Sequence, residues 1–173
     1  MSMVVYRLQR TKYAHSREDI LSGEGARITG GRWNPVGVSL IYTSATPELA
    51  HSEYIIHQKF LPPPSCNLIM IQVPDESVIK LPIETLPEGW RSYQKYGITQ
   101  NTNEVWLKEQ QSLVLQVPSA IVPMSFNYLI NPLHPDIKQV NIIQSEPFIF
   151  DERYSAPNNT NFMSSLFDEM TES

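Results

Sequence analysis

Arg32 lies in a glycine-rich run, Gly30-Gly31-Arg32-Trp33-Asn34-Pro35-Val36-Gly37, and is followed by a tyrosine at position 42 and a glutamate at position 53. Glycines in a turn let the backbone approach a ligand closely. An arginine guanidinium binds phosphate through a planar, two-pronged set of donors. The succession of arginine, aromatic ring and carboxylate therefore indicates a nucleotide site. The alternative is a surface turn that carries a solvated arginine.

Glu53 is expected on the apolar side of a helix. The run Thr46-Pro47-Glu48 is typical of a helix start, and the helix should extend to about Phe60, before three consecutive prolines. The side chains predicted to share one face are Leu49, Glu53, Ile56 and Phe60. A carboxylate on an apolar face is costly unless it is paired or used. Glu53 therefore either reaches solvent or an arginine, or works in a cleft.

Three further residues have two interpretations each. Tyr42 is expected on the apolar face of a strand over 38–43, where it either packs in the core or supports a ligand ring. Ser119 follows a proline at a strand end and either stabilises a turn or presents its hydroxyl to a cleft. Arg7 lies in the first strand and needs a partner there, which is either Glu53 or a bound anion.

Other common catalytic patterns are absent from the sequence. The four histidines do not have metal-ligand spacing, and the single cysteine, Cys66, excludes an internal disulfide and a multi-cysteine zinc site. No phosphate-binding loop, dinucleotide-binding glycine motif or serine-hydrolase elbow occurs. We therefore expect neither a metal nor a prosthetic group.

Length and composition predict one globular domain with both helices and strands. The chain has 173 residues, of which 41% are hydrophobic and 18% charged. Its net charge of −5 argues against binding nucleic acid by itself. No stretch approaches the roughly 18–20 apolar residues of a membrane span, and the start does not resemble a signal peptide, so we expect a cytoplasmic protein.

The expected elements are short because prolines are frequent. Residues 11–30 are expected to be irregular or weakly helical, and residues 155–173 to form a polar tail that is flexible or docks on a partner. Strands are predicted at 4–8, 38–43, 68–73, 113–117, 140–143 and 148–150, and a second helix at 104–111.

Several motifs in order resemble the RES-domain proteins, toxins of bacterial toxin–antitoxin pairs. The resemblance covers roughly residues 4 to 154. The motifs that carry it are Gly31–Asn34, Ile41–Ser44, Leu49–Ala50 followed by Glu53, Leu86–Trp90, Val105–Leu107, Val117–Ala120, Asn127–Pro135 and Phe150–Arg153. The arginine, glutamate and serine that name the family correspond to Arg32, Glu53 and Ser119. The chain departs from the family at Asn103–Trp106, where Gly-Asp-x-Trp is usual, but this touches none of the three.

The resemblance implies a single compact α+β domain over residues 1–154, related to the ADP-ribosyltransferase fold, with NAD as its substrate. Family members are toxic through NAD loss, by hydrolysis or phosphorolysis of the nicotinamide–ribose bond, or through ADP-ribosylation of a protein. Glu53 would stabilise positive charge on the ribose and orient the attacking group. The expected binding residues are Arg32 and Arg7 for the pyrophosphate, Tyr42 for the nicotinamide ring, Ser119 for the nicotinamide amide or a ribose hydroxyl, and Asn127.

The resemblance also implies a partner, a helix-turn-helix antitoxin of the Xre type. We expect this antitoxin to cover the cleft between Arg32 and Glu53 and to supply any DNA binding, while self-association as a homodimer is compatible with the family. Two other hypotheses remain: a nucleotide-binding module without catalysis, and a protein that only sequesters its antitoxin. The joint presence of Arg32, Tyr42, Glu53 and Ser119 disfavours the module without catalysis.

Overall fold

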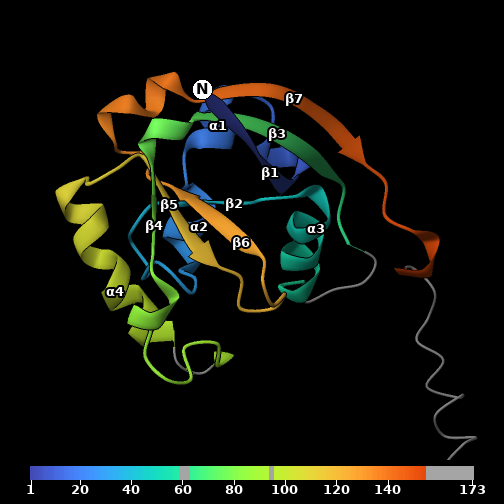
Figure 1. The fold of residues 1–173 in the computed structure, drawn as a ribbon. Coiled ribbons are helices and arrows are strands. Elements are labelled where there is room, and N and C mark those ends of the chain that lie inside the picture. The colour runs from blue at the N-terminus through green and yellow to red at the C-terminus, as the bar shows by residue number, and fades with distance from the viewer. Residues whose placement is uncertain (59–62, 94–95, 155–173) are drawn as a thin grey trace, which may run out of the picture.

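A seven-stranded mixed sheet organises the chain (Figure 1). The computed structural model describes residues 1–58, 63–93 and 96–154. The strands are β1 (Ser2–Arg10), β2 (Ile41–Ser44), β3 (Cys66–Pro74), β4 (Val78–Lys80), β5 (Val114–Pro118), β6 (Phe126–Ile130) and β7 (Asn141–Phe148). Their order is β4-β5-β6-β2-β1-β3-β7, and only β4 and β5 pair in parallel. Strands β5, β6 and β2 are therefore direct neighbours.

The α-helices in the described part of the chain are α1 (Arg17–Leu21), α2 (Glu24–Thr29), α3 (Pro47–Ile56) and α4 (Tyr96–Glu109). In Figure 1, α3 and α4 lie on either side of β5 and β6. Helix α3 begins as expected, with Pro47 in its first turn and the Thr46 hydroxyl accepting a hydrogen bond from the backbone N–H of Leu49 at 3.2 Å. The expected α+β class is confirmed.

Alternating side chains place a core on each face of the sheet. One core contains Val5, Ile41, Ile69, Val114 and Ile130, and α1 adds Ile20 and Leu21. The other contains Leu40, Leu115, Val117 and Leu129 together with three tryptophans, Trp33, Trp90 and Trp106. The second core supports the segments that carry the candidate site.

The structure contains strands at the expected places, with shifted ends, and it also contains two strands that the sequence did not predict. Strand β2 begins at Ile41 rather than Val38, and the predicted piece 148–150 contributes only Phe148, at the end of β7. The sequence prediction missed the three-residue β4 and the central strand β6. Strand β6 was missed because Asn127, a residue disfavoured in strands, interrupts its apolar pattern.

Both predicted helices have different bounds in the structure. Helix α3 ends at Ile56, which is 62% exposed, so the predicted apolar face is wrong at that position; Phe60 lies outside the described residues. Helix α4 begins at Tyr96 rather than near Glu104. Its first half contains glycine, threonine and asparagine, which are weak helix formers, and is held by contacts described below.

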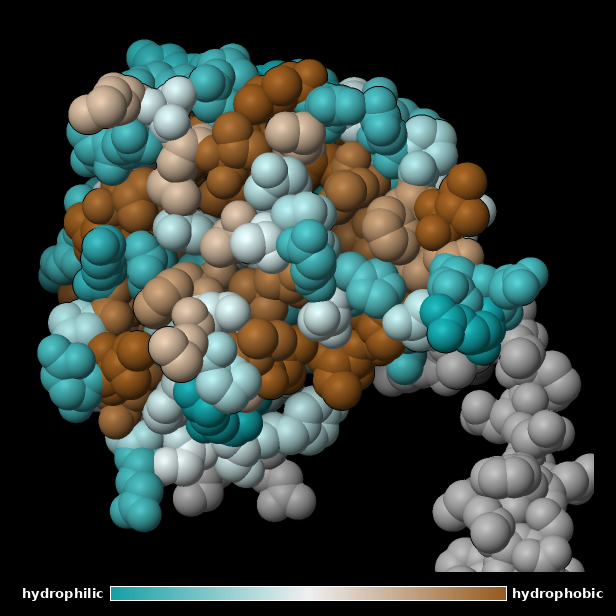
Figure 2. Space-filling model, turned by 45° about the vertical axis from the view of Figure 1, so that its right-hand side comes forward, coloured by the Kyte–Doolittle hydropathy of each residue, from teal (hydrophilic) through white to brown (hydrophobic). Residues whose placement is uncertain are grey.

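Apolar side chains on the surface are interspersed with polar ones rather than joined in one continuous patch on the face shown in Figure 2. Individual large apolar residues are exposed, among them Val36, Tyr93 and Met124. Within the described residues, no helix has the length and apolar character needed to cross a membrane. The predicted tail over 155–173 lies outside the described residues.

Candidate active site

The turn that carries Arg32 is held by helix α4. Gly31 and Asn34 form an isolated antiparallel bridge, which closes the turn. Three side chains of α4 donate hydrogen bonds to backbone carbonyls of this turn. Gln100 donates to Gly31 at 2.7 Å and to Asn34 at 3.2 Å. Thr99 donates to Arg32, and Asn103 donates to Trp33 at 2.9 Å. Every carbonyl from position 31 to 34 is thus bonded by α4. Polar side chains of α4, two of them on the weak helix formers Thr99 and Asn103, thus fix the position of Arg32.

Tyr42 supports the same turn from strand β2. Its hydroxyl accepts a hydrogen bond from the Trp33 N–H at 3.0 Å and donates to the Asn34 side chain at 2.7 Å. Burial raises the pKa of Tyr42 well above its ordinary value. Since the ring packs against the second core, the structure places Tyr42 in a supporting position, the first of its two interpretations from the sequence. Stacking of the ring on nicotinamide stays a prediction.

Gly31 offers a direct test of this packing. A Cβ at position 31 would lie 2.6 Å from the Tyr42 hydroxyl oxygen. We expect Gly31→Ala to lower the free energy of unfolding by about 1–3 kcal/mol, as overpacking does, and to reduce activity. Gly25→Ala is the control, because a Cβ there meets nothing within 4 Å in helix α2. It should stabilise by about 0.5–1 kcal/mol. Urea unfolding measures both, and equal stability of the two variants would contradict the prediction.

The Arg32 guanidinium has no carboxylate partner among the described residues. It donates to the backbone carbonyls of Trp90, Arg91 and Ser92, and its charged carbon lies 4.7 Å from the centre of the Tyr96 ring. Carbonyl dipoles and an aromatic face stabilise a cation without cancelling its charge. The site therefore keeps a positive charge suited to an anionic ligand.

Glu53 extends from α3 toward the ends of β5 and β6. Its Oε1 atom accepts hydrogen bonds from the Ser119 hydroxyl at 2.9 Å and from the Asn127 side-chain amide at 2.5 Å. Its Oε2 atom accepts no hydrogen bond from the described residues. The carboxylate is half-buried, so two donors on one oxygen fix its orientation and leave the other oxygen available.

Ser119 uses its hydroxyl fully within the protein. It donates to Glu53 and accepts from the backbone N–H groups of Ile121 and Val122 at 3.2 and 3.1 Å, and the residue is 1% exposed. Of its two interpretations from the sequence, these contacts fit the one in which Ser119 stabilises a turn, and they add a role in orienting the Glu53 carboxylate. A contact with nicotinamide or ribose stays a prediction.

Asn127 is similarly buried, at 8% exposure, and lies on β6 opposite Ser44 of β2. Its amide nitrogen donates to Glu53, and its carbonyl oxygen accepts from the Ser44 hydroxyl at 2.7 Å. These contacts direct the Asn127 amide toward Glu53, and its expected contact with substrate stays a prediction. The structure thus brings Glu53, Ser119 and Asn127 together.

Arg7 is not brought to this site. Tyr6 pairs with Ser44, so its side chain lies on the same face of the sheet as Ser44. Arg7 is the next residue of the strand and pairs with Ile69, so its side chain points to the opposite face. There its guanidinium donates to the backbone carbonyl of Ile20 at 3.2 Å, and desolvation lowers the pKa of Arg7 to about 10. The predicted pairing of Arg7 with Glu53, or with a pyrophosphate beside Arg32, does not fit this placement.

Sequence reasoning missed Tyr96 and Ser44. Burial raises the pKa of Tyr96, and so do Tyr93 and Glu53, whereas Arg32 lowers it. The Tyr96 phenol therefore lies within electrostatic reach of both Arg32 and Glu53. Tyr96 carries no motif in the sequence. Ser44 follows Tyr42 by two residues and shares its strand face, and this period of two was the available signal.

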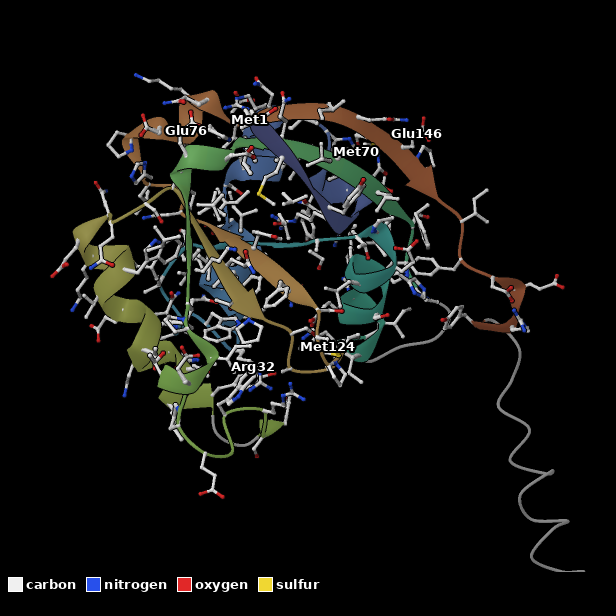
Figure 3. The ribbon with its side chains drawn as sticks, viewed as in Figure 1. Met1, Arg32, Met70, Glu76, Met124 and Glu146 are labelled. Carbon is white, nitrogen blue, oxygen red and sulfur yellow. The ribbon has the colours of Figure 1, made fainter. Side chains whose placement is uncertain are left out.

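The candidate site lies at one end of the molecule. Figure 3 shows Arg32 and Met124 at the end opposite to Met1 and Glu76. Two hollows, of about 180 and 320 Å³, lie near Glu76 and the segment 134–141, away from Glu53. Neither hollow is lined by any of the expected catalytic or binding residues. The chemistry of Arg32 and Glu53 therefore defines the candidate site better than surface shape.

Sequence comparison identifies the family. The model of the RES domain matches residues 4–151, and the chain belongs to the RES-domain family. A protein named Prs ADP-ribosylating toxin, from Sphingobium sp. (strain YBL2), is 38% identical over 139 residues, 78% of this chain and 86% of that protein. A protein named Toxin Res, from Photorhabdus laumondii, is 34% identical over 155 residues, 87% of this chain and 96% of that protein.

The fold is also similar to one solved by crystallography. The M. tuberculosis MbcT–MbcA toxin–antitoxin complex contains a chain that matches with a TM-score of 0.65 and 20% identity, over 86% of this chain and 85% of that chain. At this identity the likeness concerns the fold. It agrees with the family assignment made from the sequence.

Proposed function

We propose that this chain is the toxin of a bacterial toxin–antitoxin pair and that it cleaves the nicotinamide–ribose bond of NAD. The observation that carries the proposal is the half-buried carboxylate of Glu53, bonded through Oε1 only, at a site where Arg32 has no carboxylate partner among the described residues. The names of the relatives, Toxin Res and Prs ADP-ribosylating toxin, support the class of function.

One carboxylate is sufficient for this cleavage. When the bond between C1″ of the nicotinamide ribose and the pyridinium nitrogen breaks, its electron pair stays on nitrogen and nicotinamide leaves as a neutral base. No general acid is needed, unlike in the hydrolysis of sugar–oxygen bonds, where two carboxyl groups cooperate. The ribose acquires oxocarbenium character, and the Glu53 carboxylate stabilises that positive charge.

The second half of the reaction needs a nucleophile. Water or phosphate adds through oxygen to C1″, and a water nucleophile then loses a proton. Oε2 of Glu53 is the acceptor that its hydrogen bonds leave available. The same oxygen can hold a ribose hydroxyl before cleavage. Arg32 binds the diphosphate through the donors that do not face the loop carbonyls, and Tyr96 forms the aromatic wall beside it.

NAD consumption by the purified chain tests the proposal. We expect free nicotinamide together with ADP-ribose if water is the nucleophile, or with ADP-ribose 1″-phosphate, formed only when phosphate is added, if phosphate is. Mass spectrometry of the separated products distinguishes the two. Intact NAD after incubation with a folded, partner-free sample would contradict cleavage.

Transfer of ADP-ribose to a protein is the second candidate, favoured by the name of the Sphingobium relative. Nicotinamide would then be released only when an acceptor protein is present, and that protein would gain the mass of ADP-ribose. A helix-turn-helix antitoxin of the Xre type that covers the Arg32–Glu53 site is the partner we propose. The similar fold of a chain in a toxin–antitoxin complex supports an antitoxin as the partner.

A further inference from the structure

Ser44 begins a chain of hydrogen bonds that ends at Glu53. Its hydroxyl donates to Oδ1 of Asn127 at 2.7 Å, and Nδ2 of Asn127 donates to Oε1 of Glu53 at 2.5 Å. Ser44 and Asn127 are direct cross-strand partners on β2 and β6, and they are 4% and 8% exposed. The backbone ladder therefore sets the distance between the first two members, and water has little access to them.

The direction of this chain follows from the chemistry of its members. An asparagine amide has nearly the same shape in its two flipped orientations, so its partners decide which end points where. An ionised carboxylate only accepts hydrogen bonds, so Asn127 must turn its N–H group toward Glu53. Its carbonyl oxygen then faces Ser44, which must donate. The Ser44 hydroxyl therefore stabilises the same orientation from the other end of the amide.

We propose that Ser44 is a positioning residue for Glu53: it fixes the amide of Asn127, which together with Ser119 holds Oε1 and so directs Oε2 toward the substrate. The expected effect of Ser44 on the rate rests on the proposed NAD cleavage. Its expected effect on the orientation of the Asn127 amide does not. Without the Ser44 hydroxyl, the buried Oδ1 loses its donor, and the amide is held only through its bond to Glu53. The productive orientation of Glu53 would then be populated less.

Thr43 provides a matched control. It precedes Ser44 on β2 and is 2% exposed, and its hydroxyl donates to the backbone carbonyl of Tyr128 at 2.7 Å on the opposite face of the sheet. Thr43→Val thus removes a buried hydroxyl of the same strand without touching the chain to Glu53. Ser44→Cys keeps a weaker donor of similar size, and Ser44→Ala removes the donor.

Steady-state kinetics on these variants tests the effect on the rate. We expect kcat for NAD cleavage to fall in the order Ser44, Ser44→Cys, Ser44→Ala, by about tenfold or more for the alanine variant, with KM for NAD changed less than threefold. Thr43→Val should keep kcat within about twofold, even where it lowers stability equally. An unchanged kcat in Ser44→Ala, or an equal loss in Thr43→Val, would overturn the proposal; if Ser44→Ala does not fold, Ser44→Cys decides.

The side-chain amide signals of Asn127 in an NMR spectrum give a readout that does not depend on turnover. In the unmodified protein, one amide proton should be shifted downfield by its bond to the carboxylate and should exchange slowly with solvent. Ser44→Ala should reduce both effects, and Thr43→Val should not. If the protein leaves NAD intact, the proposed function fails while these signals still decide the role of Ser44. Unchanged Asn127 signals in both Ser44 variants would overturn it.

Discussion

Replacing Glu53 by glutamine is expected to lower the rate of NAD cleavage by on the order of 10²–10⁴-fold while the chain stays folded. Glutamine has the shape of glutamate, and its side-chain oxygen can still accept the hydrogen bonds from Ser119 and Asn127. What it lacks is the negative charge opposite the developing positive charge on the ribose. The loss should therefore appear in kcat, with a smaller change in KM.

Glu48→Gln is the control for this experiment. Glu48 lies in the first turn of the same helix and is exposed, so the variant changes the net charge equally and leaves the site intact. Nicotinamide release, followed together with circular dichroism, separates chemistry from folding. A folded Glu53→Gln protein that cleaves NAD at the normal rate would exclude Glu53 from the chemistry, and an equal loss in Glu48→Gln would point to a general charge effect.

The sequence predicted those parts of the fold in which side chains follow the rules for a core. Strands β1, β3 and β5 were expected because their apolar residues are consistent with strand periodicity, and the start of α3 because of its threonine and proline. Two of the misses, strand β6 and the first half of α4, occur where polar residues serve the site. Asn127 hid strand β6, and Thr99 and Asn103 hid the first half of α4.

This coincidence has a physical reason. Asn127 is disfavoured in a strand, yet there it bonds Glu53, and Thr99 and Asn103 are weak helix formers that bond the carbonyls of the Arg32 turn. At these positions, residues with low helix or strand propensity are present because their polar contacts position a functional group. Conflicts between local propensity and structure are expected at functional sites for this reason.

The candidate site was predictable as residue types and only partly as an arrangement. Spacing and family resemblance singled out Arg32, Glu53 and Ser119. The strand order β5-β6-β2-β1 and its register determine how these residues are arranged. They bring Ser119 into contact with Glu53 and turn Arg7 away from it. Strand order depends on contacts between distant segments, which a single sequence does not encode in any local pattern.

Replacing Arg32 by alanine is expected to raise KM for NAD by about 10–100-fold, equivalent to the roughly 1.5–3 kcal/mol of hydrogen bonds to a charged group. The guanidinium has no carboxylate partner among the described residues, so a diphosphate is its natural counter-charge. Arg32→Lys keeps the charge and loses the planar set of donors, so its KM should lie between that of the unmodified protein and that of Arg32→Ala. Arg27→Ala, in the neighbouring helix α2 with an exposed partner in Glu24, is the control and should keep the normal KM.

Arg32 also bonds the carbonyls of Trp90, Arg91 and Ser92, so its loss could act through that loop instead of through a phosphate contact. Nicotinamide riboside separates these two effects, because it has the bond to be cleaved but no phosphate. If Arg32 binds the diphosphate, Arg32→Ala lowers kcat/KM for NAD and leaves kcat/KM for the riboside nearly unchanged. An equal loss for both compounds would assign Arg32 to loop anchoring, and the diphosphate would then need another cation.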